Sequence, residues 1–172
     1  MDTNNEIIET NPFEHILYEF SMYLHAAVIQ SSNQFETNLL VDSCMVHMRN
    51  LAYFFYSESK GKKYFHYFDY IAKKLPSEIS HDLFGEIQHI ASNSTCHLLK
   101  GRLDKAFKDE TASLERLVFP IMTSLIKNFI IEAKDNVRPE YLLQWQNKKI
   151  QKNVRGLEQL ISEIENYLGK SF

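Results

Sequence analysis

Glycine, proline and cysteine are scarce in this chain of 172 residues, with five, four and two copies. Few turn-forming residues leave long uninterrupted segments, which argues against a β sandwich or barrel and favours helices. The two cysteines, Cys44 and Cys96, form no C-x-x-C pair, so neither a disulfide framework nor a thioredoxin-like motif is expected. A reducing, cytoplasmic location is the simplest expectation.

A long apolar run and a strong net charge are also missing. The most apolar stretch, residues 117–131, is interrupted by Pro120, Ser124 and Lys127, whereas a membrane span needs about 20 apolar residues. The start of the chain, "MDTNNEIIETNPF", has neither the basic nor the apolar part of a signal peptide. The net charge of −3 gives no overall attraction to nucleic acid. Residues 134–155 hold six cations and two acids, which is either a local basic surface or a solvated helix face.

Complete catalytic signatures are absent as well. The chain has no G-x-S-x-G, no G-x-x-x-x-G-K-[ST], no G-x-G-x-x-G and no H-E-x-x-H. These absences argue against serine hydrolases, nucleotide and dinucleotide enzymes, and zinc proteases. No cofactor is therefore expected.

The apolar residues that are present recur at helical spacing. We predict an all-α protein of one domain, residues 1–172, with residues 1–10 as a flexible tail and the rest as an up-and-down bundle of four to five long helices. Asn11 and Pro12 predict a capped helix entry, whereas Pro120 should bend a helix or mark its start. The expected helices span residues 12–31, 34–57, 64–75, 77–100, 112–134 and 139–168, with 101–111 as a charged connector and a weak point at Gly156.

Strong polar side chains interrupt two of these apolar patterns. His47, Arg49 and Asn50 stand within four residues of a helix otherwise suited to a protein core. Residues four apart on a helix share a face, so the expected helix 77–100 should present a ladder of imidazoles and amides. This ladder comprises His89, Asn93 and His97. If the two helices pack antiparallel, both sets could meet in one polar pocket.

Such a pocket would suit cleavage of RNA by its own 2′-hydroxyl. That reaction needs a base, an acid and positive charge near the phosphate, but no metal. We assign His97 as the general acid/base, Asn93 as its orienting residue, and Arg49 or Arg102 as the phosphate contact. His47, Asn50 and His89 are further binding candidates. Each of these residues could equally be a hydrogen-bonded interior group.

The stretch "HMRNLAYFFY", residues 47–56, resembles a set of uncharacterised bacterial helical proteins with an H-x-R-N-L…F-F-Y helix. More distantly, the layout resembles the HEPN superfamily (higher eukaryotes and prokaryotes nucleotide-binding). The resemblance implies a dimeric helical bundle and a metal-independent ribonuclease of toxin–antitoxin or phage-defence type, or an inactive relative. The HEPN motif is Arg, then a polar residue, then His after four to six positions. Asn93 and His97 match it, but Ser92 stands at the arginine position.

Two other classes of function remain open from the sequence. The first is a non-catalytic interaction bundle, either a homodimer or the partner of a cognate protein. The aromatic segment 64–70, "YFHYFDY", could supply a dimer surface or belong to the core. The second is a metal-binding bundle using some of Cys44, His47, His89, Cys96 and His97.

Overall fold

The computed structural model describes residues 11–29, 32–56, 66–76, 79–95 and 105–168. Within these residues the chain is helical, and its only β pairing is an isolated bridge between Ile71 and Val137. The all-α bundle predicted from the sequence is confirmed. Four helices of 17 residues or more form its frame, which are α1 (Pro12–Val28), α2 (Gln34–Phe55), α4 (Lys105–Asn136) and α6 (Lys148–Leu168). Shorter elements are α3 (His81–Thr95), α5 (Leu142–Trp145) and the 3-10 turns η2 (Tyr67–Asp69) and η4 (Pro139–Tyr141).

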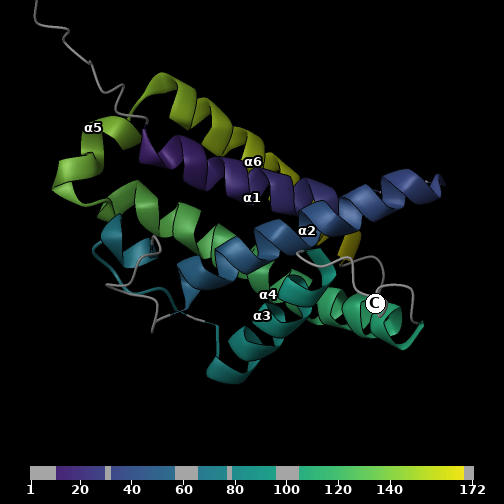
Figure 1. Ribbon diagram of the computed structural model, residues 1–172. Helices are drawn as coiled ribbons and strands as arrows, with labels where there is room; N and C mark the ends of the chain where they lie inside the picture. The colour runs from purple at the N-terminus through teal and green to yellow at the C-terminus, as the bar shows by residue number, and fades with distance from the viewer. Residues whose placement is uncertain (1–10, 30–31, 57–65, 77–78, 96–104, 169–172) are drawn as a thin grey trace, which may run out of the picture.

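Helix α1 occupies the middle of the bundle, with α2 on one side and α6 on the other (Figure 1). Its entry follows the sequence signal, since Asn11 Oδ1 accepts a hydrogen bond from Phe13 N at 3.0 Å and Pro12 stands at the first helical position. Asn11 Nδ2 also donates to Gln144 O at 2.9 Å, which ties this helix start to α5. The cap therefore fixes both where α1 begins and where it sits.

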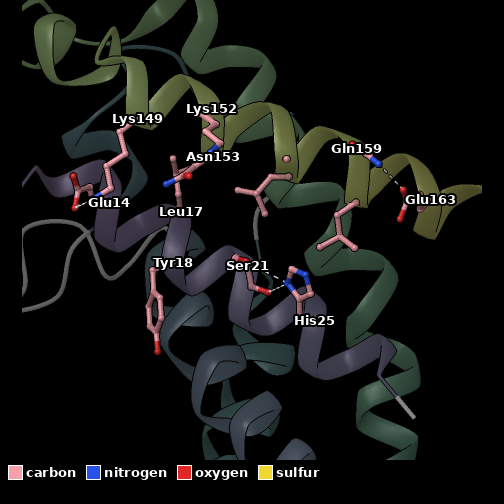
Figure 2. Close-up of a pocket in the computed structure, with 13 residues that line it drawn as sticks. Glu14, Leu17, Tyr18, Ser21, His25, Lys149, Lys152, Asn153, Gln159 and Glu163 are labelled. Carbon is pink, nitrogen blue, oxygen red and sulfur yellow. Dashed lines mark hydrogen bonds and ion pairs between the residues drawn. The ribbon is translucent and has the colours of Figure 1, made fainter.

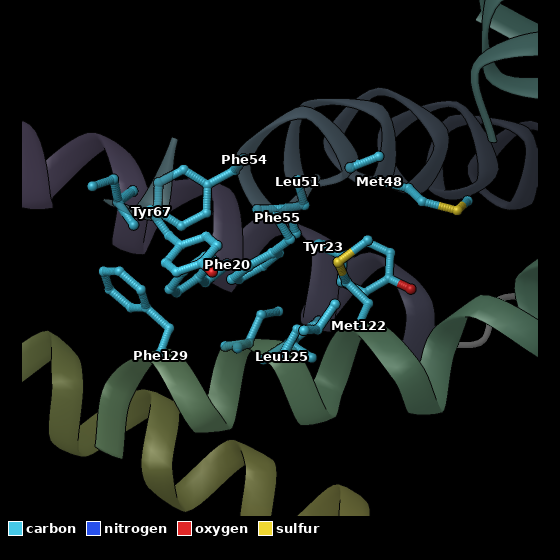
Figure 3. Packing of buried hydrophobic residues seen from close by; sticks show 14 of the residues in the cluster. Phe20, Tyr23, Met48, Leu51, Phe54, Phe55, Tyr67, Met122, Leu125 and Phe129 are labelled. Carbon is cyan, nitrogen blue, oxygen red and sulfur yellow. The ribbon is translucent and has the colours of Figure 1, made fainter. Parts of the chain in front are cut away.

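Aromatic rings fill the space between α1, α2 and α4 (Figure 3). Phe20 is fully buried, with ring centroids 5.9 Å from Phe54, 5.9 Å from Phe55 and 5.5 Å from Phe129. Tyr67 belongs to the same core, so the aromatic segment contributes to the interior in its described part and does not form an exposed dimer patch there. Aromatic residues make up 13% of the chain, and the rings named here are used for packing.

Several predicted boundaries are wrong in their described parts. The segment expected as a helix over 64–75 contains only the turn η2 before the chain extends into the bridge at Ile71. Helix α3 begins at His81, where the Ser80 hydroxyl accepts from Leu83 N at 3.3 Å; the expected start, Ser77, lies outside the described residues. Residues 105–111, expected as a connector, form the first turns of α4, and Pro120 lies inside that helix without beginning it.

The C-terminal segment departs from the prediction in another way. The single helix expected over 139–168 is divided into η4, α5 and α6, because the chain turns at Gln146 and Asn147. Asn147 Oδ1 accepts from Lys149 N at 2.9 Å and so caps α6. The helix then continues to Leu168 through Gly156, where a weak point was expected. No helix in the described part of the chain is long and apolar enough to cross a membrane.

Candidate functional site: a carboxylate between two imidazoles

Glu19 is a carboxylate on the side of α1 that faces the core. It follows Ile16 by three residues and precedes Tyr23 by four, so all three stand on one ridge of the helix. Both apolar neighbours are buried, and Glu19 itself is only 9% exposed. A carboxylate at this depth must be paired or hydrogen-bonded to remain charged.

Two side chains of α2 supply the partners of Glu19. His47 Nδ1 lies 2.7 Å from Glu19 Oε2, and Asn50 Nδ2 donates to the same oxygen at 3.1 Å. His47 is also buried, at 8% exposure. Two of the three polar residues that stood out in the α2 sequence, His47 and Asn50, are therefore explained by the fold, because they bind Glu19 on the opposing face of α1.

A second imidazole approaches the other oxygen of the carboxylate. His15 Nε2 lies 3.8 Å from Glu19 Oε1, one helical turn earlier on α1, and this ring is mostly exposed. Tyr18 lies edge-on to the His47 ring at 5.8 Å between centroids and is 52% exposed. We call the five residues His15, Tyr18, Glu19, His47 and Asn50 the α1–α2 polar cluster. It has a buried inner part and a rim open to solvent.

The electrostatics of the cluster favour an ionised carboxylate. Burial alone would raise the pKa of Glu19, but the hydrogen bonds from His47 and Asn50 and the charges of His47 and His15 together lower it below its ordinary value. The carboxylate therefore stays charged at neutral pH and acts as a fixed acceptor. Because it accepts from His47 Nδ1, the proton of a neutral imidazole is held on Nδ1, and Nε2 keeps its lone pair.

An imidazole oriented by a carboxylate can accept and return a proton through its other ring nitrogen. In the described residues, no other hydrogen bond holds the His47 ring. The cluster thus has the arrangement of an acid–base pair, with Asn50 fixing the carboxylate and His15 as a second titratable ring. No three histidine, cysteine, aspartate or glutamate side chains of the described residues are grouped so that they could hold a metal ion.

The residues predicted from the sequence fall into three groups. His47 and Asn50 contribute to the α1–α2 polar cluster. Arg49 stands two residues from His47, hence about 160° away around the helix axis, on the side where Tyr53 meets Phe84 of α3 at 5.2 Å. His47 and Arg49 therefore face different helices.

The remaining predicted residues belong to α3 and the segment after it. His89 is exposed on α3, and the backbone of Asn93 lies in the same helix, but the side chain of Asn93 is outside the described residues. His97 and Arg102 lie outside them as well, as does Cys96. Their convergence with Arg49 stays a prediction.

Glu19 was missed by sequence reasoning. The signal was present, because an acid interrupts an otherwise apolar ridge of α1 between Ile16 and Tyr23. Its partners lie 28 and 31 positions away, and helical periodicity does not specify which neighbouring helix a face will meet.

Three of the six cations in the basic stretch over 134–155 are bound to groups within the chain. Lys134 pairs with Glu158 at 2.6 Å and Lys149 with Glu14 at 3.0 Å, while Arg138 donates to Phe68 O at 2.7 Å. These three cations are tied to groups of the protein itself. The stretch is therefore closer to an ordinary solvated, paired helix surface than to a continuous phosphate-binding patch.

Comparison with known proteins adds no relative: no protein-family model, no curated protein and no solved structure matches the chain. The HEPN resemblance accordingly stays a prediction. The features of the structure that bear on function are the contacts of the α1–α2 polar cluster and the surfaces around it.

Proposed function

We propose that this protein acts on RNA, as a HEPN-like ribonuclease that needs no metal, with the Glu19–His47 pair as its acid–base centre. The observation that supports this assignment most directly is the 2.7 Å contact between His47 Nδ1 and the buried Glu19 carboxylate. That contact fixes the ring and leaves Nε2 as the nitrogen that can take a proton. It replaces His97 with His47 as the leading candidate for the base.

In the proposed reaction, His47 Nε2 accepts the proton of a ribose 2′-hydroxyl. The 2′-oxygen then forms a bond to the adjacent phosphorus, and the bond from phosphorus to the 5′-oxygen breaks. The leaving 5′-oxygen takes a proton from a second acid, for which the exposed ring of His15 is positioned on the opposite oxygen of Glu19. The products are a 2′,3′-cyclic phosphate and a 5′-hydroxyl, and no electron is gained or lost.

RNA is the favoured substrate class because of the rim of the cluster. Proteins recognise unpaired RNA bases by stacking them on exposed aromatic rings. Tyr18 is such a ring, being half exposed and directly beside the imidazole. A base stacked on Tyr18 would bring its ribose to the entrance of the polar cluster.

The test uses purified protein and end-labelled single-stranded RNA in the presence of a chelator. We expect slow cleavage that yields 2′,3′-cyclic phosphate ends, and we expect His47→Ala to lower its rate by about 10²–10⁴-fold, the usual contribution of a positioned acid or base. Glu19→Gln should lower the rate while leaving RNA binding intact. Tyr18→Ala should weaken binding of single strands.

The matched control is His25→Ala. His25 is an exposed histidine of α1, the helix that carries Glu19, and it lies outside the cluster. Its Nδ1 is hydrogen-bonded to Ser21 O at 2.8 Å. This change should leave the rate unaltered. Absence of cleavage by the wild-type protein, or an unchanged rate in His47→Ala, would overturn the proposal.

A further inference from the structure

A groove of about 680 Å³ runs along the surface between α1 and α6 (Figure 2). Leu17, Leu157 and Leu160 contribute its apolar part, and charged or amide side chains of α6 line the outer wall. The volume is in the range of sites that take a ligand or a segment of another protein. It belongs to a different face of α1 from Glu19, and the inference drawn from it does not depend on the proposed function.

Gly156 stands in this groove, in the interior of α6. A helix with glycine in its interior is less stable than one with alanine there. Glycine is the usual residue where another group approaches the backbone closely. Among the described residues no such group is present, because a Cβ placed on Gly156 would meet nothing within 4 Å. The residue is also exposed, which leaves its backbone open to a group from a second molecule.

The order of charged residues along α6 also favours binding of a second molecule. A helix is stabilised by acids in its first turns and cations in its last turns, owing to its dipole. Helix α6 has the reverse order, with no acid in its first turn and no basic residue in its last turn. The cations before Gly156 are Lys148, Lys149, Lys152 and Arg155, and the acids after it are Glu158, Glu163 and Glu165.

Four of the α6 residues that line the groove form two pairs placed symmetrically about Gly156 in the sequence. Lys149 precedes it by seven residues and Glu163 follows it by seven. Asn153 precedes it by three and Gln159 follows it by three. At about 100° per residue, all four stand within about 60° of Gly156 around the helix axis.

We propose that a second copy of this chain docks in the groove, with the two α6 helices antiparallel and crossing at Gly156. In that arrangement the two glycines face one another and permit close approach of the backbones. Lys149 lies opposite the partner's Glu163, and Asn153 lies opposite the partner's Gln159, each contact occurring twice by symmetry. The reversed charge order, unfavourable within one helix, becomes complementary between two antiparallel ones.

The contacts that Lys149 and Glu163 make within the chain are weak enough to be replaced by contacts with a second copy. Lys149 is bound to Glu14 at 3.0 Å, but both groups are more than two-fifths exposed, so the pair is weak and can be replaced. Glu163 accepts only from Gln159 of its own helix among the described residues, at 2.9 Å. Leu160, half buried at the groove edge, lies opposite the methylene stem of the partner's Lys152.

Sedimentation equilibrium of the purified full chain tests this arrangement. We expect a monomer–dimer equilibrium in the micromolar range, in keeping with a small interface between solvated surfaces. Gly156→Leu should weaken association at least 10-fold, whereas Ser162→Leu, an exposed change about 120° away around α6, should not. Gly156→Ala gives a sharper signature: thermal stability of the dilute monomer should rise while association weakens.

Exchanging the charges of Lys149 and Glu163 tests whether these residues face one another across the two antiparallel α6 helices. Lys149→Glu and Glu163→Lys should each weaken association, because like charges then face one another, and the double change K149E/E163K should restore it. The control is Arg155→Glu, one residue from Gly156 and therefore about 100° away. A wild-type monomer at about 100 µM, well above the expected micromolar Kd, would overturn the proposal. So would wild-type association in Gly156→Leu, or a double change no better than its singles.

Discussion

Replacing Glu19 by glutamine removes the charge of the α1–α2 polar cluster while keeping its shape, and its effect on stability can be worked out from the contacts. The wild-type carboxylate accepts from His47 at 2.7 Å and from Asn50 at 3.1 Å. Hydrogen bonds to a charged group contribute about 1.5–3 kcal/mol each, and neutral ones about 0.5–1.5 kcal/mol. Both donors reach the same oxygen, which a carboxamide retains, so both bonds persist but become neutral and each weakens by about 1–1.5 kcal/mol.

The loss is partly offset because a charge no longer has to be buried. We therefore expect Glu19→Gln to lower the free energy of unfolding by about 2 kcal/mol at neutral pH, and the melting temperature by about 4–8 °C for a domain of this size. Urea titration followed by circular dichroism measures the first quantity. The control is Glu158→Gln, which removes an ion pair with Lys134 between two exposed side chains and should change stability by less than about 0.5 kcal/mol.

The pH dependence of the stability difference between the wild type and Glu19→Gln tests whether the carboxylate is charged and hydrogen-bonded in the folded protein. Since the folded pKa of Glu19 lies below the ordinary value of 4.5, its charge contributes stability that is fully present above 4.5 and is lost as the pH falls through the folded pKa. The glutamine variant does not titrate at this position. The stability gap between the two proteins should therefore close as the pH is lowered below about 4.5. A gap that stays constant into this range, or no gap at neutral pH, would show that the carboxylate is not held as described.

Two further changes test the frame that positions the cluster. Phe20→Ala should cost about 3–5 kcal/mol in urea titrations, because the ring is fully buried against three others and its removal leaves a cavity between α1, α2 and α4; a cost below about 1 kcal/mol would contradict this packing. Asn11→Ala should cost about 1 kcal/mol by the same measurement, because the first turn of α1 loses its cap and Gln144 O loses a donor, whereas Asn11→Asp, which keeps the cap, should cost less.

Helical periodicity predicted the frame of this protein well because α1 and α2 each bury a regular apolar stripe. The prediction from periodicity and composition was wrong where residues typical of loops form part of a helix. The charge density of residues 105–111 predicts a connector, but lysine, alanine and glutamate are good helix formers and these residues extend α4. Glycine at position 156 predicts a weak point, yet one glycine costs too little to interrupt a helix packed along its length.

The candidate site was only half predictable. His47 and Asn50 stood out because their polarity conflicts with the apolar stripe around them. Their partner could not be identified, because the rotation of α2 against α1 depends on how Phe20, Phe54 and Phe55 pack, not on spacing along the chain. The same rotation places Arg49 on the side of α3, away from the imidazole.

Tyr18 is the one residue shared by the two surfaces described above. It contacts the His47 ring on the α2 side of α1 and lines the groove on the α6 side. The residues that define each proposal are otherwise distinct, since Glu19 and His47 are buried between α1 and α2, whereas Gly156 is exposed on α6. Gly156→Leu should therefore leave the contacts of the acid–base pair in place, and His47→Ala should leave the groove in place. Because α1 separates the two surfaces, failure of either experiment would count against its own proposal and not against the other.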